Sequence, residues 1–282
     1  MEPADGLADL VTTEYAKVRL SDVTLASATQ EQLEQVLHEQ QQRDLLESHG
    51  LTPLRRLLLT GPLGTGKSMT ASALATELSL PLVTIRIDAL ISKYTGDTAA
   101  KLRVIFDAMA HPRTVYLFDD LDMIAERQTF WTDIVDERRI LDMFLSFLDG
   151  TQPESLVVAV ADHSTLLDDA LLSRFDAVIA YYLPDSAQAL DLLRKRLGAM
   201  DTSAVSWDEI ANHVKGLSQA RLVRAAESAA KRAILSGSDS VSTSALVTSL
   251  RELRRIHHAT GFSIGAWGLG NVNSKMILID EL

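Results

Sequence analysis

The sequence predicts an α/β domain followed by a small, all-helical domain. Short apolar runs alternate with helical patterns over the first two thirds of the chain, and the runs stop after Pro184. The runs are continuously apolar, which is typical of the buried strands of a parallel sheet. We therefore predict a five-stranded parallel sheet with flanking helices, followed by a small all-α lid domain.

Five apolar runs mark the predicted strands, at residues 55–60, 82–87, 114–118, 156–161 and 177–182. Helical patterns separate them at residues 70–78, 98–110 and 137–148, and another precedes them at residues 29–48. Apolar residues recur at the helical period in the pattern 137–148, as Phe144, Leu145 and Leu148 illustrate. This alternation predicts helices on both faces of the sheet.

Four helical patterns follow, at residues 187–200, 207–215, 219–236 and 243–257. The pattern 219–236 carries an apolar face that contains Leu222, Ala226 and Ala229. We divide the chain into a mobile amino-terminal arm (1–20), the large α/β domain (21–185), the helical lid domain (186–257) and a carboxyl-terminal tail (258–282). The tail is predicted either to dock on a neighbour or partner, or to be disordered.

The composition excludes several classes of function. The chain has 282 residues, of which 46% are hydrophobic, and its formal charge is −11. The absence of cysteine excludes disulfides, zinc–thiolate sites, iron–sulfur clusters and thiol catalysis. The negative charge counts against a nucleic-acid partner. No apolar run approaches the ~18 residues of a membrane span, and the first residues do not resemble a signal peptide, so we expect a cytoplasmic protein without a membrane partner.

A phosphate-binding loop is predicted between the first strand of the sheet and the helix after it. Its spacing is G-x-x-x-x-G-K-[ST], and it consists of Gly61, Pro62, Leu63, Gly64, Thr65, Gly66, Lys67 and Ser68, with Met69 beside it. The glycines let backbone N–H groups approach one phosphate chain, and the helix adds its positive end. Lys67 is expected to reach the β- and γ-phosphates and Ser68 to offer its hydroxyl to Mg²⁺. The loop predicts a nucleoside triphosphate as ligand.

A second motif is the apolar strand that ends in Asp119 and Asp120. One carboxylate at this position suits the Mg²⁺ shell, and the other would lie near the attacking water. Two acids after a strand are also common as a loop or a helix cap. Because this strand belongs to the same predicted sheet as the phosphate loop, we interpret one of these two acids as a metal ligand together with Ser68.

With these two motifs, the chain resembles the AAA family of ATPases over about residues 19–257, and most of all its compact, single-module bacterial members. The resemblance implies ATP and Mg²⁺ as cofactors, ATP hydrolysis, self-assembly into a ring, usually a hexamer, and remodelling of a protein substrate. Relatives of this compact kind are often found beside subtilisin-like proteases, which implies such a protease as a partner.

The resemblance also assigns roles around the nucleotide. Tyr94 matches an aromatic pore residue that grips polypeptide, although it fits a surface tyrosine in a turn as well. Asp119 matches the Mg²⁺ ligand. Asp120 stands where the family usually has a glutamate that polarises water, and its side chain is one methylene shorter. Asp162 stands in place of an asparagine that senses the γ-phosphate, so an acid replaces a neutral amide.

Three further segments match the family pattern. Arg174 matches an arginine finger that reaches a neighbour's nucleotide, with a local salt bridge as the alternative, and Ser173 replaces a second arginine. Ala220 belongs to the start of the helix that closes over adenine and sugar. Arg221 beside it is either a second phosphate sensor or a solvated side chain. Val23 matches the segment that lines the adenine pocket.

Three functions are consistent with these motifs. The first is an ATP-driven ring that remodels or unfolds protein. The second is an ATP-binding regulatory or scaffold subunit with weak hydrolysis, since Asp120, Asp162 and Ser173 all depart from the family pattern. The third is a nucleic-acid-handling relative, against which the charge of the chain counts.

Overall fold

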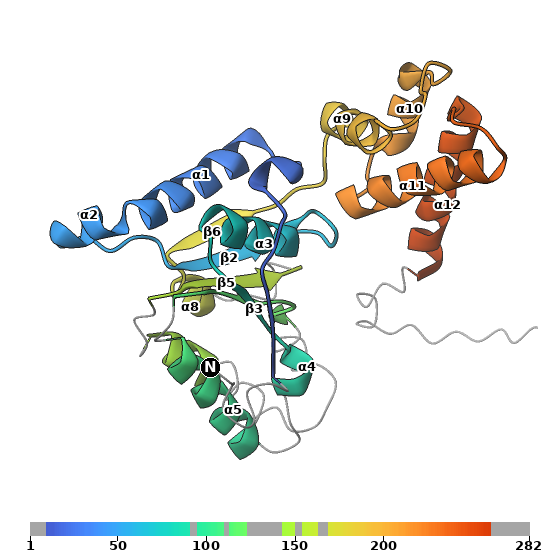
Figure 1. Ribbon diagram of the computed structural model, residues 1–282. Helices are drawn as coiled ribbons and strands as arrows, with labels where there is room; N and C mark the ends of the chain where they lie inside the picture. Colours follow the sequence, from blue (N-terminus) through green and yellow to red (C-terminus); the bar gives the residue numbers. More distant parts are fainter. Residues whose placement is uncertain are drawn as a thin grey trace, which may run out of the picture.

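The computed structural model describes residues 10–90, 95–109, 113–122, 143–149, 154–162 and 169–260. A mixed sheet lies between two layers of helices, and a separate group of helices extends from one side of it (Figure 1). The α/β class and the all-helical character of residues 186–257 agree with the sequence prediction.

The sheet has six strands in the order β1-β3-β4-β5-β2-β6. Their bounds are β1 (Val11–Glu14), β2 (Arg56–Thr60), β3 (Leu82–Ile85), β4 (Val115–Phe118), β5 (Leu156–Ala161) and β6 (Ala177–Ala180). The pairs among β2 to β6 are parallel, as predicted. The additional strand β1 is antiparallel to β3, with Val11 opposite Ile85.

The expectation of a mobile arm over residues 1–20 does not hold for β1. The physical reason is local: Val11, Thr12 and Thr13 are β-branched residues that favour extended backbone. They also pair with an edge of β3 that would otherwise expose its hydrogen-bonding groups. A short 3-10 helix, η1 (Leu20–Asp22), then leads into the large domain.

One face of the sheet is covered by α1 (Ser27–Gln41) and α3 (Lys67–Glu77). Leu57 and Leu59 of β2 point toward these helices, whereas Leu58 points to the opposite face, because successive side chains of a strand alternate. The single helix predicted at 29–48 is instead two, since α2 (Arg43–Ser48) is separated from α1 by the non-helical backbone of Gln42.

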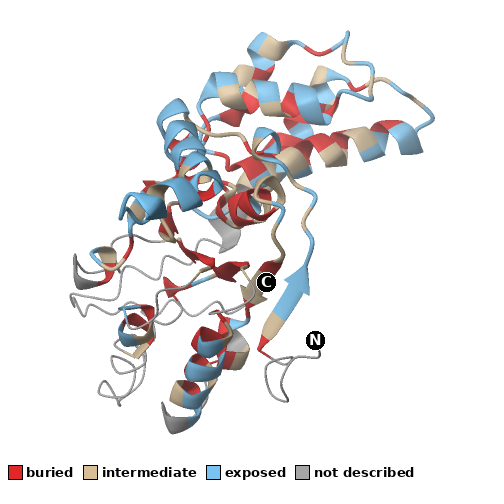
Figure 2. Cartoon of the chain, turned by 60° about the vertical axis from the view of Figure 1, so that its left-hand side comes forward, coloured by how far each residue is buried: buried red, intermediate tan, exposed pale blue. Residues whose placement is uncertain are grey.

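The other face is covered by α4 (Ile87–Leu90), α5 (Thr95–Ala108), the helical residues 143–149 and α8 (Asp169–Leu172). Aromatic rings fill this layer: the centroids of Phe106 and Phe118 are 6.0 Å apart, and those of Phe118 and Phe144 are 5.1 Å apart. Figure 2 shows the inner strands of the sheet as the most buried part of the large domain, with exposed residues on β1 and on the outer helix faces.

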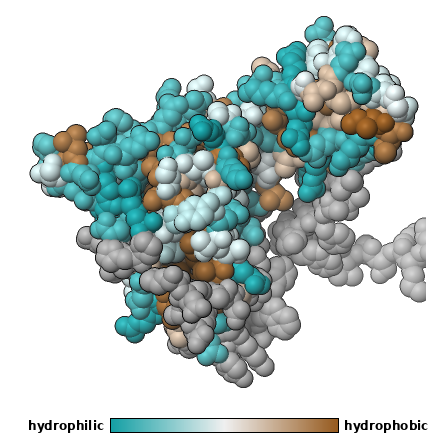
Figure 3. Space-filling model, in the orientation of Figure 1, coloured by the Kyte–Doolittle hydropathy of each residue, from teal (hydrophilic) through white to brown (hydrophobic). Residues whose placement is uncertain are grey.

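The lid contains α9 (Ser186–Arg196), α10 (Trp207–Val214), α11 (Gln219–Leu235) and α12 (Thr243–Thr260). These helices enclose a hydrophobic core of their own, which includes Leu193, Ile210, Leu222 and Leu246. The face shown in Figure 3 is largely hydrophilic, and its apolar patches are small and separate. In the described part of the chain, no helix has the length and apolar character needed to cross a membrane.

Candidate functional site

The predicted motifs converge at the carboxyl ends of the central strands. The loop 61–66 follows β2, Asp119 and Asp120 follow β4, and Asp162 follows β5. Because β2, β5 and β4 are adjacent parallel strands, their carboxyl ends lie side by side at one edge of the sheet. The structure thus brings together side chains that are far apart in the sequence.

The phosphate loop has backbone that requires glycine. The φ angle of Gly61 is 139° and that of Gly66, the N-cap of α3, is 100°. A Cβ atom at Gly61 would lie 2.2 Å from the carbonyl oxygen of Tyr181, which is closer than any real contact. Tyr181 is itself fixed, since its hydroxyl donates to Thr70 Oγ1 at 2.7 Å. These contacts hold the loop against β6 and α3.

Most carbonyl groups of the loop accept hydrogen bonds from the protein, whereas most of its amides donate none to the described residues. Lys67 Nζ donates to the carbonyl oxygens of Gly61 and Pro62, and the amide of Ala220 donates to that of Gly64. No amide of residues 63–68 donates a hydrogen bond within the described part of the chain. Several free N–H groups at the amino end of α3 form the concave, positive surface that binds anions.

Lys67 is the first residue of α3, and only 4% of its side chain is exposed. Its Nζ is 2.6 Å from the Gly61 oxygen, 3.0 Å from the Pro62 oxygen and 2.7 Å from Asp162 Oδ1. The lysine therefore has three protein acceptors, one of which is a full negative charge. Asp162, which the sequence placed near the γ-phosphate, holds the cation that a phosphate would also attract.

Ser68 and Asp119, the two predicted metal ligands, are in contact, and their binding of a metal stays a prediction. The Ser68 hydroxyl donates to Asp119 Oδ1 at 3.0 Å. Among the described residues, no cluster of three or more acidic or histidine side chains could hold a metal without other ligands. One hydroxyl and one carboxylate fit Mg²⁺, which keeps several waters and binds substrate phosphates as well.

Asp120 has an unusual backbone and an unusual charge environment. Its φ angle is 56°, in the left-handed region that aspartate tolerates better than most residues. Partial burial raises the pKa of its carboxyl group, and the nearby carboxylates of Asp119, Asp122 and Asp162 raise it further, against an opposing effect of Lys67. A carboxylate with increased proton affinity is suited to accept a proton from water.

The family resemblance assigns Asp122 to a stretch that faces the neighbouring subunit, and the sequence prediction missed its role within this site. Asp122 is 7% exposed, and its Oδ2 accepts a hydrogen bond from the Asp162 amide at 3.1 Å. The Leu121 amide donates to the Val160 oxygen at 2.8 Å in the same region. The segment after β4 thus fixes the end of β5 and, through it, the position of the Asp162 carboxylate.

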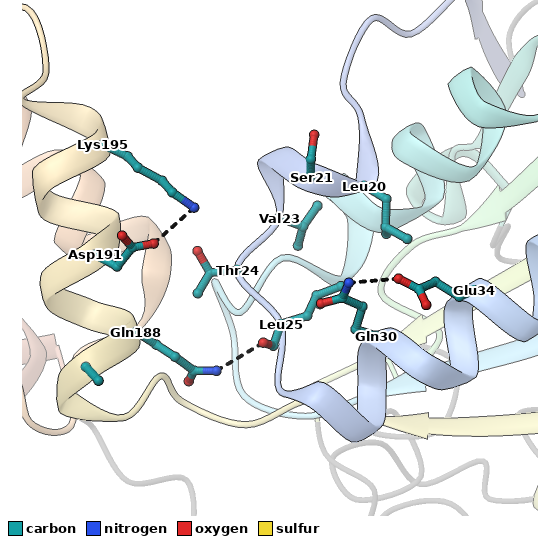
Figure 4. A pocket seen from close by; sticks show the side chains of 11 residues that line it. Leu20, Ser21, Val23, Thr24, Leu25, Gln30, Glu34, Gln188, Asp191 and Lys195 are labelled. Carbon is teal, nitrogen blue, oxygen red and sulfur yellow. Dashed lines mark hydrogen bonds and ion pairs between the residues drawn. The ribbon is translucent and has the colours of Figure 1, made fainter.

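Val23 lies at the junction of the large domain and the lid. Its side chain is 7% exposed and contacts Gly66 closely, because a Cβ at Gly66 would lie 2.9 Å from Val23 Cγ1. A cavity of about 560 Å³ opens beside it, between the η1 segment and α9 (Figure 4). On the lid side, Gln188 Nε2 donates to the Leu25 oxygen at 3.0 Å. Val23 is therefore a wall residue next to the phosphate loop, and its contact with adenine stays a prediction.

Gln219 is the second residue that the prediction missed. It is the first residue of α11 and is 9% exposed. Its Nε2 donates to the carbonyl oxygen of Thr65 at 3.0 Å and also to that of Thr24. The predicted contact residue Ala220 approaches the phosphate loop through its amide, which is 3.1 Å from the Gly64 oxygen. Arg221 is half-buried at the same helix turn.

Two predicted contacts with neighbouring molecules have different outcomes. Arg174 forms an ion pair with Asp149 within the chain, and 42% of its side chain is exposed. This is the salt-bridge alternative, and the finger role stays a prediction because it requires a neighbour. Tyr94 lies outside the described residues.

The fold and the site define a phosphate-loop nucleotide-binding domain with a helical lid, and comparison with known proteins gives its family. Residues 57–183 match the profile described as "ATPase family associated with various cellular activities (AAA)". An uncharacterised AAA family ATPase of Sinorhizobium fredii, y4kL, is 29% identical over 233 residues, which are 82% of this chain and 70% of that protein. Residues 57–183 thus form a domain of the AAA family.

Other relatives are longer than this chain. The ATP-dependent zinc metalloprotease FtsH 3 of Sphaerobacter thermophilus is 31% identical, and the match covers 84% of this chain and 50% of that protein. For Protein SAV of Sulfolobus acidocaldarius the identity is 33%, over 81% of this chain and 31% of that protein. The crystal structure of the FIGL-1 AAA domain has a TM-score of 0.68 at 20% identity and covers 90% of this chain and 91% of that one, which shows the shared fold.

Proposed function

We propose that this chain binds and hydrolyses ATP as a subunit of an AAA ring that remodels a protein substrate. The observation that carries the proposal is the phosphate loop, in which Lys67 is a buried cation and the amides of residues 63–68 donate no hydrogen bond within the described residues. Protein as the substrate class is supported by the printed names of relatives such as the ATP-dependent metalloprotease FtsH 3, in which ATP is coupled to protein cleavage.

Each site residue has a task in this proposal. The loop amides and Lys67 bind the phosphates of ATP, and Ser68 and Asp119 hold Mg²⁺, which neutralises phosphate charge. Asp120 accepts a proton from the attacking water or orients it. Val23 and Ala220 are near enough to the loop to contact adenine and sugar. Leu63 and Met69 are exposed at the loop and border the phosphates.

The direct test is titration of the full chain with a fluorescent ATP analogue, together with steady-state ATPase turnover. We expect Mg²⁺-dependent binding and turnover that rises with protein concentration as rings assemble. Lys67→Met should lose both, because the phosphates lose their main cationic partner. Unchanged binding in Lys67→Met would overturn the nucleotide-site assignment.

The ring itself is tested by mixing two inactive subunits. Arg174→Ala retains an intact nucleotide site, and Lys67→Met retains an intact arginine. If Arg174 acts on a neighbour's nucleotide, mixtures should recover part of the ATPase activity that each variant lacks alone. If the ATPase activity of the mixtures is only the weighted sum of the activities of the two variants, Arg174 does not act on the nucleotide of a neighbouring subunit. Tyr94→Ala should spare ATPase activity but prevent remodelling of a model protein substrate.

A subunit that binds ATP but hydrolyses it slowly is the second candidate function. It is favoured by the Lys67–Asp162 ion pair and by the short Asp120 side chain, since misplacing a catalytic group by about 1 Å can reduce a rate about a hundredfold. Turnover separates the two candidates. If the wild-type chain binds ATP but hydrolyses almost none, and Asp120→Glu restores turnover, then the chain acts through ATP binding and not through hydrolysis.

A further inference from the structure

We propose that Gln219 is a positioning residue of the phosphate site, through which the lid sets the orientation of the phosphate-binding amides. The inference rests on the proposed function, because it assumes that phosphates bind at residues 61–68. It goes beyond that function in assigning part of the phosphate affinity to a lid side chain whose amide donates to backbone carbonyl oxygens.

Gln219 joins three separate segments of the chain. Its Nε2 donates to the Thr65 oxygen, in the phosphate loop, and to the Thr24 oxygen, in the segment beside Val23. Its Oε1 lies 3.6 Å from the position that a Cβ at Gly66 would occupy. Only 9% of Gln219 is exposed, so its side-chain amide is buried between the lid, the phosphate loop and the segment that contains Thr24.

A second bond from the same helix turn acts on the next peptide of the loop. The amide of Ala220 donates to the Gly64 oxygen at 3.1 Å, and Ser218 Oγ would be 2.8 Å from a Cβ at Gly64. The lid therefore binds the carbonyl oxygens of two consecutive loop peptides, Gly64–Thr65 and Thr65–Gly66. Both bonds end on the phosphate loop, and both begin in the first turn of α11.

Because the peptide bond is planar, these contacts also fix the direction in which the loop amides point. In a trans peptide the C=O and N–H bonds point in opposite directions. When the Thr65 oxygen faces Gln219, the amide of Gly66 must therefore face away from the lid. The same holds for the Thr65 amide when the Gly64 oxygen faces Ala220. These two amides are among those that donate no hydrogen bond within the described residues, and so remain open to an anion.

Hydrogen bonding also strengthens the amides as donors. A carbonyl that accepts a hydrogen bond polarises its peptide, which increases the positive charge on the N–H group at the other end. Removal of the Gln219 donor would leave the Thr65–Gly66 peptide both less polarised and freer to rotate. The expected consequence is weaker binding of any phosphate chain, with or without a base attached.

The structure offers a matched control in Gln188. This glutamine is also a lid residue, and its Nε2 also donates to a linker carbonyl, that of Leu25, at 3.0 Å. It makes no contact with the phosphate loop in the hydrogen bonds of the described residues. Comparison of Gln219→Met with Gln188→Met therefore separates the effect on loop peptides from a general loosening of the lid.

The experiment measures the dissociation constants of ADP and of inorganic tripolyphosphate for the full chain, the latter by competition with a fluorescent ADP analogue. We expect Gln219→Met to weaken both ligands by about tenfold, the value of one well-placed hydrogen bond. Because Gln188 lines the cavity beside Val23, where the base of ADP could reach it, its variant is compared through tripolyphosphate alone, whose binding should change by no more than about twofold. Thermal unfolding checks that each variant is folded, and Gln219→Leu replaces Gln219→Met if the latter is not.

The outcomes separate this inference from the proposed function. Equal losses of tripolyphosphate affinity in the Gln219 and Gln188 variants would overturn the inference, since any loosening of the lid would then weaken phosphate binding. Loss of ADP binding with unchanged tripolyphosphate binding would also overturn it, because Gln219 would then act on the base or sugar. If the wild-type chain binds neither ligand, the proposed function fails and the inference fails with it.

Discussion

The carboxyl and amino ends of the central strands form two opposite sides of the sheet, which we call its carboxyl edge and its amino edge. Each has a buried cation surrounded by oxygen atoms. Lys67 lies at the carboxyl edge, beyond β2, and is 4% exposed. Arg43 lies near the amino edge, where Glu154 precedes β5, and is 8% exposed. Both residues bind a backbone carbonyl and a carboxylate, so a description of ion pairs alone would not distinguish them.

The difference lies in the polar groups around each cation. Arg43 donates to the Glu154 oxygen at 3.0 Å and to Glu47 at 2.9 Å, and it also pairs with the Glu154 carboxylate. Arg55 completes this network by donating to Glu47 at 2.8 Å. Around Lys67, by contrast, the amides of residues 63–68 have no donor interaction with described residues. Backbone amides beside the cation that donate no hydrogen bond to described residues, rather than the ion pair itself, therefore indicate the functional edge.

The largest expected effect that tests this comparison is on ligand binding. Lys67→Met should reduce nucleotide affinity by about a hundredfold or more, because the phosphates lose a charged hydrogen-bond partner. The free energy of unfolding of the ligand-free chain should change by less than about 1 kcal/mol, since Asp162 is partly solvated. Isothermal titration and urea unfolding measure the two quantities. The exposed residue Lys231 supplies the control, Lys231→Met, which should change neither.

Arg43→Met should have the opposite profile. Loss of its hydrogen bonds to Glu154 and Glu47 should lower the free energy of unfolding by about 2 kcal/mol, allowing for the partial exposure of both acids. Nucleotide affinity should stay within about twofold of the wild-type value. Arg196→Met removes a more exposed ion pair, with Glu227, and is the control for a surface effect. A stability loss no larger than that of the control would refute the distinction between the two edges.

Asp162→Asn tests whether the ion pair with Lys67 limits ATP affinity at the functional edge. Removal of the charge frees Lys67 for phosphate and removes repulsion, so ATP affinity should rise about fivefold. In a Lys67→Met background the same substitution should have a much smaller effect, which a double-mutant cycle measures. Asp120→Asn makes the same charge change without a contact to Lys67. An equal rise in that variant would mean that net charge, and not the ion pair, limits affinity.

The smallest expected effect is the pH dependence of Asp120. The pKa of Asp120 is raised in the folded chain, so this carboxyl group binds a proton more tightly in the folded state than in the unfolded state. At a pH where the group is ionised in both states, it therefore lowers the free energy of unfolding. Asp120→Asn should therefore stabilise the ligand-free chain at pH 7, by about 0.5 kcal/mol or less because solvent screens the group. The difference should vanish as the pH falls below ~4. Thermal unfolding at several pH values tests this sign.

The sequence predicted the parts of the fold and site whose signals are local. The continuous apolar runs identified β2 to β6, and the spacing of residues 61–68 identified the phosphate loop. The strand β1 was missed because four residues with only one fully apolar member, Val11, carry almost no periodic signal. The break at Gln42 was missed because no glycine or proline marks it.

The roles of Gln219 and Asp122 could not be predicted for a different reason. Gln219 acts on Thr65, which is 154 residues away in the sequence, and Asp122 acts on the Asp162 amide, 40 residues away. Neither residue type is specific to such a task, since glutamine and aspartate are common on protein surfaces. Only the packing of the lid and of adjacent strands reveals which backbone groups they bind.

The edge strand β1 has a mechanical consequence. Its 4 residues are held to β3 by a ladder that begins at Val11 and Ile85, and the Arg86 amide adds a bond to the Leu10 oxygen at 2.9 Å. A force applied at residue 10 and directed across the sheet would open these bonds one at a time, because each is loaded only after the one before it has broken. The strand would peel away at low force while β2 to β6 stayed intact. Tension on the amino-terminal end of the chain would thus be relieved before it could distort the edge that holds Lys67.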